Sequence, residues 1–346
     1  MNELIMNARS LGASDIHISE ERPLLLRING KLGLAPAQPE PGRIRQLILG
    51  TLDGEKLDRL EMGEDLDFAI ATPDGNRQRV NVFRYQGKLA ATIRLLNGYI
   101  PNLEQLKLPK VLKEMANEPR GLILVTGPTG SGKSTTLAAM IQHINENREE
   151  HIITVEDPIE YVYEDKRSLI HQREVGEDVG SFAGALRSAL REDPDVILVG
   201  EMRDYETISA AVTAAETGHL VMSTLHTTGA GQTIDRIIDA CPAGAQNQIR
   251  TQLSGILKGI VTQCLIPTAD GKGRIAATEI LTGTDAVLNL IRENKCYQLG
   301  SVMQSSSASG MHTLNGDLCR LVREGYITIQ NAYKYSNDKK DLEQFL

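Results

Sequence analysis

Residues 127–135, GPTGSGKST, combine closely spaced glycines with a lysine and several hydroxyl side chains. An apolar run at residues 122–125 precedes them, and apolar residues recur at helical spacing between positions 137 and 144. A glycine-rich turn between a buried strand and a helix N-terminus lets backbone N–H groups and the helix dipole hold phosphate oxygens. This is the pattern of a P-loop, and it predicts a nucleotide-binding protein.

The predicted cofactors are ATP and Mg²⁺. Lys133 is expected to reach the β- and γ-phosphates, and the Ser134 hydroxyl is expected to bind the metal. Contacts with the nucleotide are expected from the whole loop, namely Gly127, Pro128, Thr129, Gly130, Ser131, Gly132, Lys133, Ser134 and Thr135. The loop alone does not decide among kinases, helicases, switches and motors, because all of these use it.

Carboxylates follow two of the expected strands. Glu156, Asp157 and Glu160 lie in the segment TVEDPIE, and Glu201 follows the run DVILVG. ATP hydrolysis needs a group that positions the attacking water and acidic groups that help hold the metal. Glu201 resembles the acid of a Walker B element, although Gly200 occupies the place where Asp is common. A solvated acidic turn and a capping carboxylate are the alternative interpretations.

Histidines and arginines complete the candidate set. His219 and His226 flank one strand-like run, and a histidine at a strand end beside the phosphates could sense the γ-phosphate. Arg79, Arg84 and Arg94 lie on successive strand-like segments. An arginine delivered to the γ-phosphate raises the rate by about 10³- to 10⁵-fold in other NTPases. Structural histidines and solvated surface charges are the alternatives.

The composition is that of a globular protein and disfavours nucleic acid as a partner. The chain has 346 residues, enough for two domains, with 41% hydrophobic and 24% charged residues. Its formal net charge is -8, and it has no tryptophan and four phenylalanines. An acidic chain with few aromatic side chains favours neither a basic groove nor base-stacking platforms, so no stable nucleic-acid binding is expected.

Cysteine spacing and hydropathy predict a cytoplasmic protein. The four cysteines contain no C-x-x-C pair, so neither a zinc site nor a compact disulfide framework is expected; they are Cys241, Cys264, Cys296 and Cys319. No apolar run approaches the length of a membrane span, and the first fifteen residues are amphipathic, unlike a signal peptide.

Residues 1–97 are expected to form a small α+β domain. Glu3–Ser10 is the predicted helix, and turn signals at Asn29-Gly30 and Asp74-Gly75 favour hairpins and an antiparallel sheet. The strand-like segments are 14–19, 23–30, 65–72, 77–85 and 89–96. Residues 98–109, which contain two prolines, are the expected linker.

Residues 110–346 are expected to form an α/β domain with a helical C-terminal portion. Continuous apolar runs are typical of strands buried on both faces of a parallel sheet, and they occur at 122–126, 151–156, 195–201 and 220–225. Beyond residue 280, helices are expected near 284–294, 314–325 and 328–335.

Four segments together resemble the type II/type IV secretion ATPase superfamily: GASDIHI near the N-terminus, GPTGSGKSTT, ITVEDPIEYV and the run from Ala189 to Thr227. The resemblance covers nearly the whole chain, and within the superfamily it is strongest to the motors that retract type IV pili. It implies a PAS-like N-terminal domain and a RecA-like ATPase domain with ATP bound between them. It further implies a cytoplasmic homohexamer that acts on a platform protein of the inner membrane at the pilus base.

The resemblance also implies roles for individual residues. The catalytic residues carried over from the family's motifs are Lys133, Glu160, Glu201, Arg79, Arg94, His219 and His226, and those expected at the metal are Ser134, Glu201, Glu156 and Asp157. Glu160 matches the general base and Glu201 the Walker B acid, whereas Arg84 has no counterpart in the family's arginine pair.

Two features bear on the direction of such a motor. Assembly and type II secretion motors usually carry an additional N-terminal region and a tetracysteine zinc module, neither of which this sequence shows. Retraction motors carry a helix resembling AIRNLIRE, and residues 286–293 read AVLNLIRE, with Val287 and Leu288 replacing Ile and Arg. On spacing alone, Val287, Leu290 and Ile291 predict a core-facing stripe.

Retraction in twitching motility is the expected function. An accessory retraction motor, an assembly or secretion motor, a nucleic-acid translocase and a non-hydrolysing switch are the alternatives.

Overall fold

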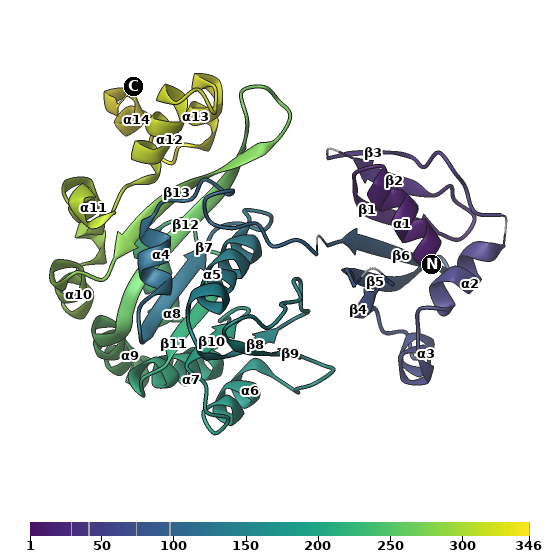
Figure 1. The fold of residues 1–346 in the computed structure, drawn as a ribbon, viewed down its shortest axis with the longest axis horizontal. Helices are drawn as coiled ribbons and strands as arrows, with labels where there is room; N and C mark the ends of the chain where they lie inside the picture. Colours follow the sequence, from purple (N-terminus) through teal and green to yellow (C-terminus); the bar gives the residue numbers. More distant parts are fainter. Residues whose placement is uncertain (29, 41, 74, 97, 346) are drawn as a thin grey trace. The chain divides into compact units, whose positions relative to one another are not determined.

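The chain forms two compact units. A computed structural model describes residues 1–28, 30–40, 42–73, 75–96 and 98–345 (Figure 1). Unit 1 comprises Met1–Tyr99 with Pro158–Val162, and unit 2 comprises Ile100–Asp157 with Tyr163–Leu346. The predicted α/β class is confirmed. Among the described residues, none of the helices combines the length and the apolarity that crossing a membrane requires.

Unit 1 is built on a six-stranded sheet in the order β3-β2-β1-β6-β5-β4, in which all neighbours are antiparallel. Its strands are β1 (Ala13–Ser19), β2 (Leu25–Ile28), β3 (Lys31–Leu34), β4 (Leu66–Ala71), β5 (Arg77–Tyr85) and β6 (Lys88–Leu95). The strands predicted on either side of Asp74-Gly75 pair as expected, and β2 pairs with β3, a strand that was not predicted; Asn29 and Asp74 of the predicted turns lie outside the described residues.

The three helices of unit 1 cover one face of this sheet. They are α1 (Asn2–Ser10), α2 (Arg43–Leu49) and α3 (Gly54–Glu61), of which only α1 was predicted. Alternate strand residues such as Ile16, Val80 and Ile93 join them in one hydrophobic core. The residues between these point to the opposite face, because side chains alternate along a strand. That face is polar and carries Arg79 and Arg94.

Unit 2 is built on a seven-stranded sheet in the order β13-β12-β7-β11-β10-β8-β9. All neighbouring pairs are parallel except the pair of β12 with β13. The strands are β7 (Gly121–Thr126), β8 (His151–Glu156), β9 (Leu169–Glu174), β10 (Val196–Val199), β11 (Leu220–Leu225), β12 (Leu257–Pro267) and β13 (Arg274–Thr282). The four predicted strands form the centre of this sheet, and the sequence analysis missed β9, β12 and β13.

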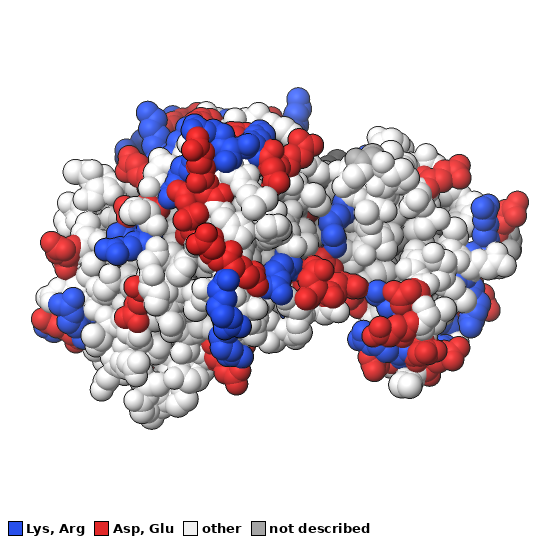
Figure 2. All heavy atoms as spheres, turned by 60° about the horizontal axis from the view of Figure 1, so that its bottom comes forward, with Lys and Arg blue, Asp and Glu red and all other residues white. Residues whose placement is uncertain are grey.

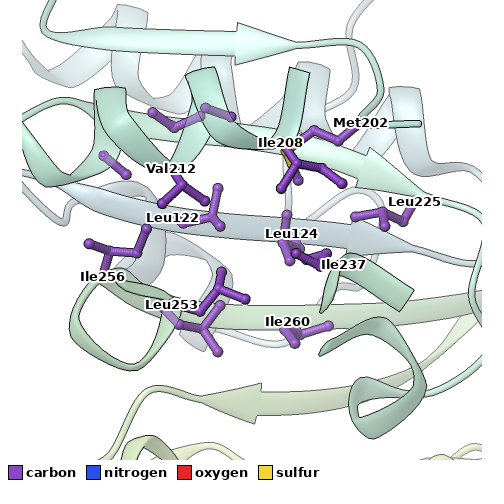
Figure 3. Close-up of a cluster of buried hydrophobic side chains, with 14 of the residues drawn as sticks. Leu122, Leu124, Met202, Ile208, Val212, Leu225, Ile237, Leu253, Ile256 and Ile260 are labelled. Carbon is purple, nitrogen blue, oxygen red and sulfur yellow. The ribbon is translucent and has the colours of Figure 1, made fainter. Parts of the chain in front are cut away.

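Helices cover both faces of the second sheet, which explains the continuous apolar runs. On one face, α4 (Val111–Ala116) and α5 (Lys133–Asn147) pack against residues such as Ile123 and Val125. On the other face, a larger cluster includes Leu122 and Leu124 of β7 (Figure 3). The helices of that face are α6 (Phe182–Ala189), α7 (Tyr205–Glu216), α8 (Ala230–Asp239) and α9 (Ala243–Ile256).

The C-terminal portion is helical, as predicted. It comprises α10 (Asp285–Arg292), α11 (Leu299–Ser305), α12 (Leu314–Arg323), α13 (Ile329–Tyr335) and α14 (Lys339–Phe345). In α10, Val287 and Ile291 are fully buried and Leu290 is half-buried, so the stripe in AVLNLIRE faces the core as its spacing predicted. The helices α12–α14 form their own small core with the ends of β12 and β13.

Leu124 lies at the centre of the cluster in Figure 3 and is fully buried. We expect Leu124→Ala to lower the free energy of unfolding by about 2–5 kcal/mol, because it removes buried methyl groups and leaves a cavity. Leu169→Ala is the control, since Leu169 is 48% exposed on the edge strand β9, and it should change stability by less than about 0.5 kcal/mol. Calorimetry measures the free energy of unfolding of both variants. Similar losses in the two would contradict the assignment of Leu124 to the core.

Candidate nucleotide-binding site

The loop of residues 127–132 connects β7 to α5 with a backbone that only glycine adopts easily. Gly127, Gly130 and Gly132 have φ of 141°, 77° and 92°. A Cβ on Gly127 would lie 2.2 Å from the backbone oxygen of Gln263, so no side chain fits there. The fully buried strand β7 and the 15-residue helix α5 hold the two ends of the loop. The loop therefore has the tight turn and the open helix N-terminus that phosphate binding requires.

Lys133 lies across its own loop. Its Nζ donates hydrogen bonds to the carbonyls of Gly127 (2.9 Å) and Pro128 (3.2 Å). The same Nζ lies 3.5 Å from Nδ1 of His226. Ser134 is exposed in the first turn of α5, and Thr135 is half-exposed beside it. The ammonium and the hydroxyl are thus placed at the helix N-terminus, where the sequence analysis expected them.

His226 links the P-loop lysine to Glu201. The histidine Nε2 lies 3.5 Å from Oε2 of Glu201, and the same oxygen accepts a 2.7 Å ion pair from Nε of Arg203. The Glu201 side chain is only 17% exposed. The imidazole thus faces the ammonium with Nδ1 and the carboxylate with Nε2. Lys133, His226 and Glu201 therefore form one chain of contacts.

Parallel strand pairing produces this cluster. Thr126 at the end of β7 pairs with Leu225 at the end of β11, and β11 pairs in turn with β10. The carboxyl ends of parallel strands lie at the same sheet edge, so the P-loop, His226 and Glu201 must be neighbours.

Glu156 lies further along the same edge and has other partners. Its Oε1 accepts hydrogen bonds from Thr154 (2.6 Å) and Gln172 (3.2 Å). Two strands, β11 and β10, separate β8 from β7, a strand-to-strand distance of about 14 Å. The structure thus places the Glu156 carboxylate with β8 and β9, about three strand spacings from the P-loop strand β7 and next to β10, which precedes Glu201.

Glu160, the predicted general base, lies in the segment Pro158–Val162 that groups with unit 1, and its side chain is half-buried. Asp157 precedes this segment in unit 2 and is exposed. The role of Glu160 stays a prediction, as does the metal role of Asp157.

His219 lies at the opposite edge of the sheet from His226. It precedes β11, whose first residue, Leu220, pairs with the first residue of β7. Its Nδ1 lies 2.9 Å from the carbonyl oxygen of Ala214, and Thr217 is the other neighbour at 3.2 Å. The six residues of β11 separate the two histidines by about 20 Å. The structure therefore does not place His219 with the P-loop of its own chain, because one strand joins the two histidines end to end.

The predicted arginine pair lies on the polar face of unit 1. Arg79 and Arg94 are direct cross-strand neighbours on β5 and β6. Two cations in such positions repel each other, but each has a carboxylate partner. Arg79 forms a forked contact with Asp67, at 2.5 Å between Nη2 and Oδ2, and Arg94 Nε lies 3.0 Å from Asp15 Oδ1. Arg84 instead donates to the carbonyl of Leu60 (3.3 Å), a bond that joins β5 to α3.

Gln263 of β12 supports the P-loop and was not predicted. Its amide nitrogen donates to the carbonyl of Ser131 (2.7 Å), and its amide oxygen accepts from the hydroxyl of Thr136 (2.9 Å). One buried side chain thus holds the loop and the first turn of α5 together. No sequence signal marks this residue, because 132 positions separate it from Ser131.

A cavity of about 260 Å³ lies beside the first turn of α5. Its wall includes Gly132 and Thr135 of the P-loop region and Tyr326 of the C-terminal portion. The ammonium of Lys107 lies 3.7 Å from the centre of the Tyr326 ring, a cation–π contact that orders this wall. The glycine loop therefore lies next to a cavity that is lined by aromatic, polar and cationic side chains.

We expect Gln263→Leu to weaken binding of ADP by about 5- to 100-fold, or about 1–3 kcal/mol in total, because the loop loses the hydrogen bonds that hold it to the first turn of α5. Gln142→Leu is the matched control on α5, since Gln142 contacts Glu146 and not the loop. Titration with a fluorescent ADP analogue measures both affinities. Unchanged binding by Gln263→Leu would show that the loop keeps its shape without this side chain.

Comparison with known proteins identifies relatives of the whole chain. The family model described as "Type II/IV secretion system protein" matches residues 1–334. A "Twitching motility protein" of Neisseria gonorrhoeae is 53% identical over 278 residues, which cover 80% of this chain and 74% of that protein. The "Type IV pilus retractation ATPase PilT" of Pseudomonas aeruginosa is 45% identical over 335 residues, which cover 96% of each chain.

A solved structure has the same fold over its full length. The crystal structure of the pilus retraction motor PilT with bound ADP is 47% identical in sequence and matches with a TM-score of 0.91 over 99% of both chains. The ADP in that structure agrees with the prediction of a nucleotide-binding protein. Together with the family match, this similarity shows that the chain belongs to the type II/IV secretion system protein family.

Proposed function

We propose that this chain is an ATP-hydrolysing subunit of a homohexameric motor that powers retraction of type IV pili in twitching motility. The contact of Lys133 with His226, and of His226 with Glu201, carries the proposal, because it supports a joint role of a lysine, a histidine and a carboxylate at one edge of the sheet in binding a magnesium nucleotide. The names of the relatives supply the direction of the motor.

The site fits a magnesium nucleotide. Phosphates would bind to the N–H groups of loop 127–132 and to Lys133, and the base and ribose would enter the cavity beside Thr135. Ser134 and Glu201 would hold Mg²⁺, since a hydroxyl and a carboxylate oxygen are donors that this ion prefers. Bound Mg²⁺ would neutralise part of the negative charge of the phosphates.

The protein residues contribute positioning and electrostatics. Lys133 would exchange its two loop carbonyls for phosphate oxygens, and His226 would hydrogen-bond to the γ-phosphate or to the attacking water. Glu160 would take the proton of that water as general base. Arg79 and Arg94 would exchange Asp67 and Asp15 for the triphosphate, which stabilises the charge that develops on it.

The wider setting is also part of the proposal. A cytoplasmic ring at the inner face of the membrane would act on a platform protein at the pilus base. The four cysteines lie in four different parts of unit 2 and all are free thiols, unlike a tetracysteine zinc module of assembly or secretion motors. On the face drawn in Figure 2, acidic and basic side chains are interspersed, which does not favour a nucleic-acid translocase.

We expect Glu160→Ala to bind ATP with nearly wild-type affinity and to lose turnover by at least about 10²-fold, because the attacking water loses its base. Glu164→Ala is the control, since Glu164 is an exposed glutamate four residues further along the chain. Phosphate release and nucleotide titration on the same preparations separate binding from chemistry. Turnover near the wild-type rate would remove Glu160 from the role of base.

The direction of the motor is tested in the cell. We expect Lys133→Ala in the source organism to give excess surface pili and to abolish twitching motility, because assembly continues without retraction. Electron microscopy and a surface-motility assay measure the two effects, with Lys166→Ala, an exposed lysine paired with Glu146, as the control. Cells without pili would instead assign the chain to assembly.

A further inference from the structure

Glu279 of β13 joins two helices at their N-termini. Its Oε1 accepts a 2.8 Å hydrogen bond from the backbone N–H of Ala230, the first residue of α8. The backbone N–H of Leu314, the first residue of α12, lies near the same carboxylate. The side chain is half-buried, and this burial raises the pKa of the Glu279 carboxyl, whereas the Leu314 N–H lowers it. Two helix dipoles with their positive ends toward the carboxylate stabilise a charge that burial disfavours.

One of these helices begins directly after the nucleotide site. Only Thr227, Thr228 and Gly229 separate His226 from α8. The hydroxyl of Thr233 in α8 donates to the Gly229 carbonyl (2.8 Å) and contacts the Thr227 hydroxyl (2.7 Å). These hydrogen bonds hold the segment from His226 to the first turn of α8 together. A displacement of the histidine ring would therefore also displace the residues that contact Glu279.

The other helix, α12, packs together with α13 and α14 at the C-terminal end of the chain. The carboxylate of Asp317 in α12 accepts from the backbone N–H (2.8 Å) and the hydroxyl (3.1 Å) of Thr278, the residue before Glu279. Asn315 donates to Asp341 of α14 (2.7 Å), and α12–α14 share one core. A second contact joins the C-terminal helices to the loop after β11, because Asn337 donates to the carbonyl of Thr228 (3.4 Å).

We propose that Glu279 is a positioning residue that couples the loop after β11, with its sensor His226, to the C-terminal helices α12–α14. A carboxylate is the group that suits this task, because one oxygen accepts from Ala230 of α8 and the carboxylate can also accept from the N–H groups at the start of α12. Glutamine has one acceptor oxygen and would turn its NH₂ donor toward the second N–H, so that one helix is released. A partner that moves α12–α14 would thereby change the position of His226. The inference rests on the proposed function, because its effect on His226 is read in ATP turnover.

The test is a double-mutant cycle of Glu279→Gln and His226→Ala. We expect Glu279→Gln to lower kcat about tenfold with KM changed less than about twofold, the size of one charged hydrogen bond. In the His226→Ala background the same change should cause no further loss of kcat, because Glu279 acts through the histidine. Glu150→Gln, at a half-buried glutamate paired with Arg148 (2.7 Å), is the control and should match the wild type.

Several outcomes would overturn the proposal. Wild-type kcat in Glu279→Gln, or an equal fold-loss in both backgrounds, would show that Glu279 does not act through His226. If Glu279→Gln does not fold, Asn337→Ala tests the second contact of the same coupling, with a smaller loss of kcat expected. Absence of turnover in the wild type would refute the proposed function alone. Hydrogen exchange of the Leu314 amide then decides the coupling, since it should respond to bound nucleotide in the wild type and not in Glu279→Gln.

Discussion

The parallel pairing of β7 with β11 is the constraint on which the site depends. It places the P-loop and His226 after neighbouring strand ends, and the next strand, β10, adds Glu201 to the same edge. The pairing is held by helices on both faces of the sheet, so these strand ends are fixed by the cores of unit 2. Chemistry that needs a lysine, a histidine and a carboxylate within contact distance thus follows from topology.

The charged groups of the candidate site have partners within the protein. Lys133 bonds two loop carbonyls, Arg203 pairs with Glu201, and the arginines of unit 1 pair with Asp67 and Asp15. Nucleotide binding would therefore be an exchange of partners, in which side chains already ordered by these bonds turn to phosphate oxygens. Pre-ordered groups lose less conformational freedom on binding, which favours both affinity and catalysis.

The sequence was informative where chemistry and strong local patterns coincide. The P-loop, the four central strands of unit 2 and five strands of unit 1 follow from glycine spacing, apolar runs and alternation, and α10 buries its predicted stripe. The short helices α2 and α3 and the exposed strand β3 were missed, and each of them spans eight residues or fewer. Gln263 and Glu279 were missed for another reason, because their partners are distant in sequence and only the tertiary fold makes them visible. The histidine pair shows the converse limit, since the resemblance assigns one role to His219 and His226, whereas the strand predicted between them holds them at opposite edges of the sheet.

The most direct test of the account is the affinity of purified protein for ADP and for a non-hydrolysable ATP analogue, in the wild type and in His226→Ala. If His226 reads the γ-phosphate beside Lys133, the wild type binds the triphosphate more tightly than ADP. His226→Ala then loses this preference and keeps its affinity for ADP. The same preference in both proteins would contradict the account, because the contact of His226 with the P-loop lysine would then have no part in recognising the nucleotide.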